Sequence, residues 1–128
     1  MEAELRKDPM MAYLLDALGR GEDIGHYGRL VFAMVARHFG DTDEVVAALR
    51  RDRDFSEADA RALLDQVNAA DYNPPKRDKI LEFQSRQAFA IVPHPDDPDA
   101  GNVYKHLRFP DRVYGHIAEY HEAKAAAR

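Results

Sequence analysis

The sequence contains no cysteine. The chain therefore forms no disulfide, no thiolate zinc site and no cysteine-ligated iron–sulfur cluster, and it has no cysteine nucleophile. No run of apolar residues approaches the length that crosses a bilayer, and the acidic start Met1–Glu4 is unlike a signal peptide. From these absences we expect no contact with a membrane and a cytoplasmic location.

The chain also has a deficit of positive charge. It carries 18 Lys and Arg against 23 Asp and Glu, a formal net charge of −5. Non-specific binding of duplex DNA scales with the number of phosphates that a protein neutralises, so the composition disfavours binding by bulk charge. A local basic site on an acidic body remains compatible with it. The 128 residues, 45% of them hydrophobic, are enough for one domain with a substantial core.

Apolar residues recur at helical spacing along most of the chain, and capping residues and glycines separate the segments. The pattern predicts about six helices and no sheet, which is an all-α bundle in which residues 1–128 form a single domain. Residues 1–8 are polar and are expected to be frayed. The predicted helices cover residues 9–18, 26–39, 41–49, 56–70, 76–86 and 111–126.

The segment 87–110 is rich in Pro and Asp and precedes the last predicted helix. We predict a loop here, and because its length is unusual for a passive connection, we expect it to be packed or functional. Within it, Ala88–Val92 is the one strand-like run of the chain. A single strand cannot form a sheet, so this run does not change the predicted fold class.

The most informative segment is Ile24–Gly40. Its apolar residues predict one core-facing helical stripe, whereas His26, Arg29 and Arg37 fall off that stripe. A helix N-terminus with His and Arg nearby suits an anion such as a phosphate, and Arg29 and Arg37 share one helix face approximately. By spacing alone, an ordinary solvated face is the simpler interpretation.

A second basic segment follows the break Tyr72–Pro75, where two prolines force an extended path. Lys76, Arg77, Lys79 and Arg86 come directly after it, with Phe83 among them. Basic residues beside an aromatic ring are typical of phosphate and base contacts. Taken alone, the same residues are more simply interpreted as the solvated face of a helix.

The loop His94-Pro95-Asp96-Asp97 is similar to the zinc-binding turn of zinc-dependent sugar deacetylases, in which a His and an Asp hold the metal. In those enzymes the turn ends a strand of a Rossmann-like sheet. The residues that follow it here are expected to form a loop and a helix instead, so we interpret the match as accidental.

Taken in order, the motifs of residues 8–86 resemble the C-terminal domain of the archaeal and eukaryotic DNA primase large subunit. That family has a Pro-Pro-Cys segment, a Leu-x-His-x-x-Arg motif that opens a long helix ending at Gly, an acidic helix start, a Phe-x-Glu-x-x-x-Arg helix and a Tyr-x-Pro-Pro segment. The matching residues here are Asp8-Pro9-Met10, Ile24-Gly25-His26-Tyr27-Gly28-Arg29, Gly40, Asp43-Glu44-Val45-Val46, Phe55-Ser56-Glu57 with Arg61, Gln66-Val67 and Tyr72-Asn73-Pro74-Pro75. Each motif is modest, and the series is more specific than its parts.

The family holds an iron–sulfur cluster with four cysteines, and this chain has none of them. The resemblance places the first three former ligand positions at Met10, Arg77 and Arg86, and the fourth in the loop around 92–100. It therefore implies a cluster-free, stand-alone variant whose core is closed by side-chain packing. It implies no cofactor, and the one small ligand that it implies is a nucleotide with its Mg²⁺.

In the family this domain is not a catalyst. It binds the template strand and the 5′-triphosphate of the initiating nucleotide or primer, and it assists a catalytic subunit. The resemblance thus implies a non-enzymatic accessory domain whose partners are single-stranded DNA or an RNA–DNA primer and a catalytic primase or primase–polymerase.

The family's triphosphate contacts correspond to His26, Arg29 and Arg37 here. Where some members have a further His and Arg, this chain has Asp23 and Gly25, and we expect Lys76 and Arg77 to compensate. Two alternatives remain. One is an adaptor that keeps the fold without binding nucleic acid, and the other is a zinc hydrolase that uses His94, Asp96 and Asp97.

Overall fold

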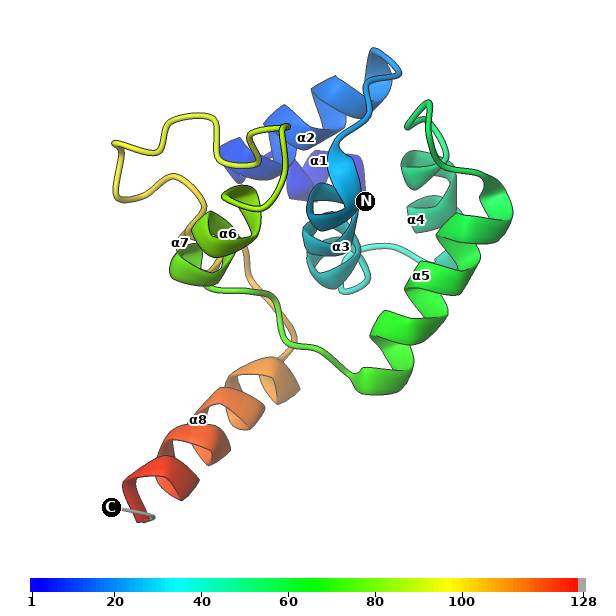
Figure 1. Cartoon of the computed structure of the whole chain (residues 1–128). Coiled ribbons are helices and arrows are strands. Elements are labelled where there is room, and N and C mark those ends of the chain that lie inside the picture. Colours follow the sequence, from blue (N-terminus) through cyan, green and yellow to red (C-terminus); the bar gives the residue numbers. More distant parts are fainter. Residues whose placement is uncertain (127–128) are drawn as a thin grey trace.

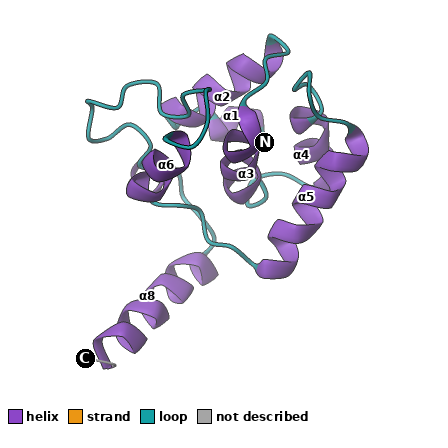
Figure 2. Cartoon of the chain, viewed as in Figure 1, coloured by secondary structure: helices purple, strands orange, loops and turns teal. Residues whose placement is uncertain are grey.

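A computed structural model describes the backbone of residues 1–126 and the side chains of residues 1–118. That part of the chain contains eight helices and no strand, which confirms the predicted all-α, single-domain fold (Figure 2). Six of the helices correspond to the predicted ones, and the short α1 and α7 are additional. The helices are α1 (Glu2–Leu5), α2 (Pro9–Gly19), α3 (Gly25–Ala36), α4 (Thr42–Leu49), α5 (Glu57–Ala70), α6 (Arg77–Gln84), α7 (Val103–His106) and α8 (Asp111–Ala126).

Helix α3 runs through the middle of the molecule, with α2, α4, α5 and α6 packed against it (Figure 1). Every residue from Val31 to Ala36 is buried, so this part of the helix is apolar on all sides, as is typical of a helix inside a core. The two arginines that the sequence places off the apolar stripe therefore do not form a solvated face, although His26 is exposed. The side chains of Arg29 and Arg37 are only 11% and 7% exposed.

Three helices begin at side-chain caps formed by residues close in sequence. The carboxylate of Asp8 accepts the N–H of Met11 at 2.9 Å, and Pro9 occupies the first helical position of α2. Asp41 and Glu44 form a reciprocal capping box at α4. The Ser56 hydroxyl accepts the N–H of Asp59 at 3.1 Å. Each such cap stabilises its helix by about 1 kcal/mol.

The N-terminal residues are not frayed, contrary to the prediction. Residues Glu2–Leu5 form α1, and the side chain of Leu5 is fully buried in the core. The terminal ammonium of Met1 lies 3.5 Å from the carboxylate of Glu44, and the Met1 side chain covers Gly40. Leu5 and Met1 together anchor a segment whose composition is otherwise mostly polar.

The segment 87–110 is packed rather than a free loop. It contributes six buried apolar residues, namely Ile91, Val92, Ala100, Val103, Leu107 and Phe109, and it contains α7. Its first residue, Gln87, reaches the start of α3: its Nε2 donates to the carbonyl of Ile24 at 2.9 Å, and its Oε1 accepts the N–H of Tyr27 at 2.8 Å. The loop thus caps the central helix from a distant part of the chain.

Helix α8 begins beside the end of α5 and points away from the rest of the molecule (Figure 1). In this helix Val113, Ile117 and Tyr120 recur at helical spacing. Val113 is buried, and Tyr114 and Ile117 pack partly against the core. The side chains of Tyr120 and His121 lie outside the described residues. Among the described residues, no helix is both long and apolar enough to cross a membrane.

The substitution Gln87→Ala tests the long-range cap of α3. It leaves the carbonyl of Ile24 and the N–H of Tyr27 without their partner, so we expect the free energy of unfolding to fall by about 1–3 kcal/mol. Urea denaturation followed by circular dichroism measures this change. Arg86→Ala is the control, because it removes only an exposed ion pair with Glu82 and should change stability by less than about 0.5 kcal/mol. Equal effects of the two variants would contradict the capping role.

Candidate functional site

The N-terminus of α3, predicted to bind an external anion, is occupied by groups of the chain itself. The N–H of Ile24 donates to the buried Asp52 carboxylate at 2.9 Å, and the N–H of Gly25 donates to Asp23 at 2.8 Å. The N–H of Tyr27 donates to Gln87 at 2.8 Å. Two carboxylates therefore take the place of the phosphate that the sequence suggests.

Arg29 belongs to the same internal network. Its Nη1 lies 3.0 Å from Asp23 and 3.2 Å from Asp52, whose side chain is 0% exposed. Its guanidinium carbon also lies 4.5 Å from the centre of the Phe55 ring. Because the charge of Arg29 is already balanced by two carboxylates, we assign this residue a structural role.

Arg37 is held in a second network at the end of α5. Its guanidinium donates to the Asp71 carboxylate at 2.8 Å, to the carbonyl of Tyr72 at 2.9 Å and to Asn68 at 3.2 Å. Asp71 ends α5 in the left-handed conformation (φ 50°) and also accepts from Arg112 of α8 at 2.9 Å. These hydrogen bonds, from Arg37 first and then Arg112, lower the pKa of Asp71 from 3.8 to about 2.

His38, next to this network, is a core histidine. Burial, with a smaller effect from the charges of Arg37 and Arg112, lowers its pKa to about 4. Its ring packs edge-on against Phe109, with 5.7 Å between the ring centres. Its Nε2 is buried and has no hydrogen-bond partner among the described residues. A neutral imidazole in this position cannot serve as a cation for phosphate.

The positions that the resemblance assigns to former cluster ligands carry side chains that cannot bind iron as thiolates do. Met10 is fully buried in the core. The guanidinium of Arg77 donates to the carbonyls of Pro95 and Ala100, at 2.5 and 2.9 Å, and Arg86 pairs with Glu82 at 2.9 Å. An iron–sulfur cluster therefore does not fit these residues.

An open pocket of about 520 Å³ lies between α3, α5, α6 and the segment that joins α5 to α6. This is within the range of sites that hold small molecules and nucleotides. Of the predicted site residues, His26 and Lys76 line this pocket, whereas Arg37 and Arg77 do not, and Arg29 lines a smaller neighbouring hollow with His26. The complete lining is His26, Leu30, Met34, Leu63, Gln66, Tyr72, Asn73, Pro75, Lys76, Lys79 and Phe83.

The pocket has an apolar floor and a cationic edge. Phe83 stacks on Tyr27 with 5.0 Å between ring centres, which holds its ring in the floor. Lys79 lies 5.2 Å from the centre of the Phe83 ring and pairs with Glu82. Lys76 and His26 form no ion pair with any described residue, so their donors are available to a ligand.

Three polar or aromatic residues of this pocket are not among the site residues that the sequence predicts. Tyr72 is 44% exposed, the one large apolar side chain among the described residues to be so exposed. The amides of Gln66, on α5, and Asn73, in the connecting segment, face the same pocket. The sequence singles out Gln66 only as part of the motif series and gives it no site role, because the packing of α5 on α3 is what brings it to the same pocket as Lys76.

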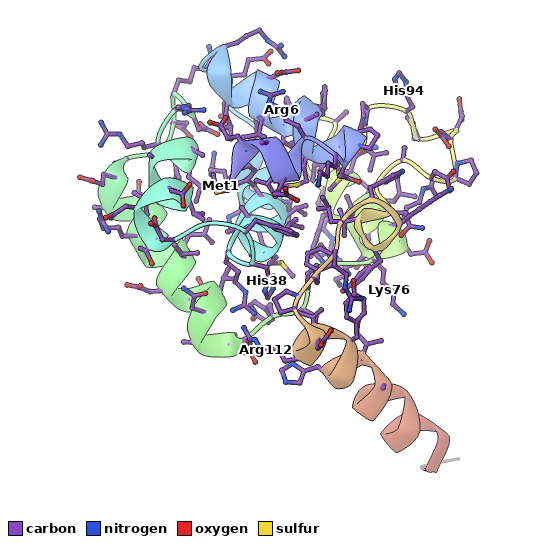
Figure 3. The ribbon with its side chains drawn as sticks, turned by 180° about the vertical axis from the view of Figure 1, so that it is seen from behind. Met1, Arg6, His38, Lys76, His94 and Arg112 are labelled. Carbon is purple, nitrogen blue, oxygen red and sulfur yellow. The ribbon has the colours of Figure 1, made fainter. Side chains whose placement is uncertain are left out.

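The zinc interpretation of His94, Asp96 and Asp97 lacks the structural context that it needs. His94 lies on the outer side of the loop, away from Lys76 (Figure 3). The residues before it, Ala88–Val92, form turns and bends instead of a strand. Within the part of the chain that the structure describes, no three His, Cys, Asp or Glu side chains are grouped to hold a metal.

The substitution Arg29→Ala tests the structural assignment of this arginine. It leaves the fully buried Asp52 carboxylate without its ion pair, so we expect a loss of about 3 kcal/mol in the free energy of unfolding. Thermal and urea denaturation measure it. Arg20→Ala removes an exposed pair with Glu22 and serves as the control, with an expected change below about 1 kcal/mol. A stable Arg29→Ala variant would show that the fold does not depend on Arg29 and that its charge is available to a ligand.

The pKa of Asp71 predicts a dependence of stability on pH. Because the carboxylate titrates at about 2 when folded and 3.8 when unfolded, its contribution is complete above about pH 5 and is lost as the pH falls toward 2. We therefore expect Asp71→Asn to be less stable than the unsubstituted protein at pH 6, with the difference shrinking on acidification. Urea titrations between pH 2 and pH 6 measure this difference. A constant difference would show that Asp71 acts through something other than its charge.

Comparison with known proteins found no matching family model, no similar curated protein and no similar solved structure. The resemblance to the primase large subunit therefore rests on the ordered motifs of residues 8–86. The geometry contributes separately: it gives structural roles to Arg29, Arg37 and Arg77, and it brings His26 and Lys76 together at one pocket.

Proposed function

We propose that this protein is a non-catalytic accessory domain that binds single-stranded nucleic acid and the 5′-triphosphate of an initiating nucleotide or primer. Its partner is a catalytic primase or primase–polymerase, and it acts in the cytoplasm. The observation that carries the proposal is the pocket between α3, α5 and α6, in which an aromatic floor adjoins the side-chain donors of His26 and Lys76. The ordered motifs of residues 8–86 support the same function.

The pocket suits both the base and the phosphates of a nucleotide. A base stacks on an aromatic face whatever its sequence, and Tyr72 and Phe83 offer such faces. Phosphate oxygens accept from ammonium and imidazole donors, which Lys76, Lys79 and His26 supply at the edge. Magnesium enters with the nucleotide, bound to its phosphates. The protein thus holds the ligand in place, and the bond-forming chemistry belongs to its partner.

The proposal moves the phosphate contacts away from Arg29 and Arg37. Both arginines are paired with carboxylates of the chain, so a phosphate would have to displace Asp52 or Asp71 to reach them. Lys76 needs no such exchange. A local cationic edge on a body with net charge −5 also predicts modest affinity and a shallow dependence on salt, because the slope scales with the number of phosphates neutralised.

Fluorescence anisotropy with short 5′-triphosphorylated and 5′-hydroxyl oligonucleotides tests this function. We expect the triphosphorylated strand to bind more tightly, and Lys76→Ala to weaken its binding about tenfold and reduce the slope of log affinity against log salt by about one. Lys7→Ala is the matched control, because Lys7 is an exposed lysine between α1 and α2, paired with Glu4.

The adaptor is the second candidate, and the mostly apolar lining of the pocket favours it. A partner protein would then insert an apolar side chain where we place a base. Equal affinity for the two oligonucleotides would remove the triphosphate role. The absence of salt-dependent binding of either would support the adaptor and overturn the nucleic-acid function.

A further inference from the structure

A second pocket of about 450 Å³ adjoins the first. It lies where α6, α7 and α8 meet, and Arg77, Asn102, Tyr104, Tyr114 and Ile117 line it. Lys76 lines both pockets. Figure 3 shows Lys76 on the flank of the molecule from which α8 emerges, with Arg112 in the first turn of that helix.

The boundary between the two pockets is a rigid piece of backbone. Pro74 and Pro75 are buried and have restricted φ angles, and the extended Lys76 that follows them precedes α6. The Tyr104 hydroxyl donates to the carbonyl of Pro74, which fastens the second pocket to this segment. Burial raises the pKa of Tyr104 to about 12, so its hydroxyl stays protonated and remains a donor. Pro75 faces the first pocket, and Lys76 stands between the two.

Each pocket presents aromatic surface. The first has Tyr72 and Phe83, and the second has Tyr104 and Tyr114, whose ring centres lie 6.5 Å apart at a steep angle. The Tyr114 hydroxyl accepts the N–H of Phe109 at 3.2 Å, which orients its ring. Two aromatic surfaces on either side of one lysine match the alternation of base, phosphate and base along a single strand.

The charges around the boundary favour a phosphate at Lys76. The partners of the Arg77 guanidinium are the carbonyls of the 95–100 loop, so its positive charge is not balanced by a carboxylate. Asp78, also at the second pocket, is the one carboxylate among the described lining residues of the two pockets. It opposes the approach of a strand into the second pocket and leaves the first unaffected.

We propose that a single strand crosses Lys76 with one base in each pocket, so that the protein's ligand is a dinucleotide step or longer, not a mononucleotide. This inference rests on the proposed function, which requires only the first pocket. The phosphate that joins the two nucleotides lies at the Lys76 ammonium. Helix α8 acquires a function in this arrangement, because Tyr114 and Ile117 form one wall of the second pocket.

Isothermal titration calorimetry with 5′-phosphorylated thymidine mono-, di- and trinucleotides and the full chain tests the inference. We expect the dinucleotide to bind about tenfold more tightly than the mononucleotide, which is the gain that one stacked base supplies. Tyr114→Ala should remove this gain and leave the affinity for the mononucleotide unchanged. Tyr114→Phe keeps the ring and should keep the gain. Tyr72→Ala should weaken the binding of all three.

A second variant keeps the test independent of the folding of α8. Asp78→Asn removes the carboxylate at the second pocket, so we expect tighter binding of the dinucleotide at low salt and no change for the mononucleotide. Equal affinities for mono- and dinucleotide in the unsubstituted protein would overturn the two-pocket arrangement and leave the proposed function standing. The absence of binding at every length would overturn both.

Discussion

The buried Asp52 carboxylate at the start of α3 is the interaction on which the rest of the structure depends. It accepts the N–H of Ile24 and pairs with Arg29, and its other oxygen accepts the N–H of Asp54 at 2.8 Å. Burying a carboxylate is unfavourable unless its oxygens are satisfied, and here the helix N-terminus, an arginine and a turn satisfy them together. This arrangement determines the orientation of the central helix and how deeply it is buried. The helices α2, α4, α5 and α6 pack against it.

That arrangement also determines which cations remain for a ligand. Arg29 lies on the central helix and Arg37 directly follows it. Charge there is tolerated only when it is paired, and Asp52 and Asp71 supply the pairs. Lys76 lies outside the core, after two prolines and before α6, and its flexible ammonium needs no internal partner. An acidic protein thus keeps a small region of unpaired positive charge at the edge of an aromatic pocket.

Contacts between residues close in sequence could be predicted, and contacts between residues far apart in sequence could not. The caps at Asp8, Asp41 and Ser56 join residues three apart, so the sequence order contains the whole interaction. The cap at α3 joins Tyr27 to Gln87 across 60 positions. The same holds for the site: Lys76 was predictable as a basic residue after a break, but the burial of Arg37 depends on Asp71, 34 positions away.

The hydrogen bonds of Arg77 join the two segments in which the resemblance places former cluster ligands. The resemblance places one former cluster ligand at Arg77 and another in the loop 92–100, and a shared metal cluster ties such segments together. In this chain the Arg77 guanidinium donates to carbonyls of that same loop, at Pro95 and Ala100. These hydrogen bonds therefore connect the start of α6 to this loop. The loop leads to Asn102 and Tyr104 at the second pocket, so the hydrogen bonds of Arg77 also position the surface on which we place the second base.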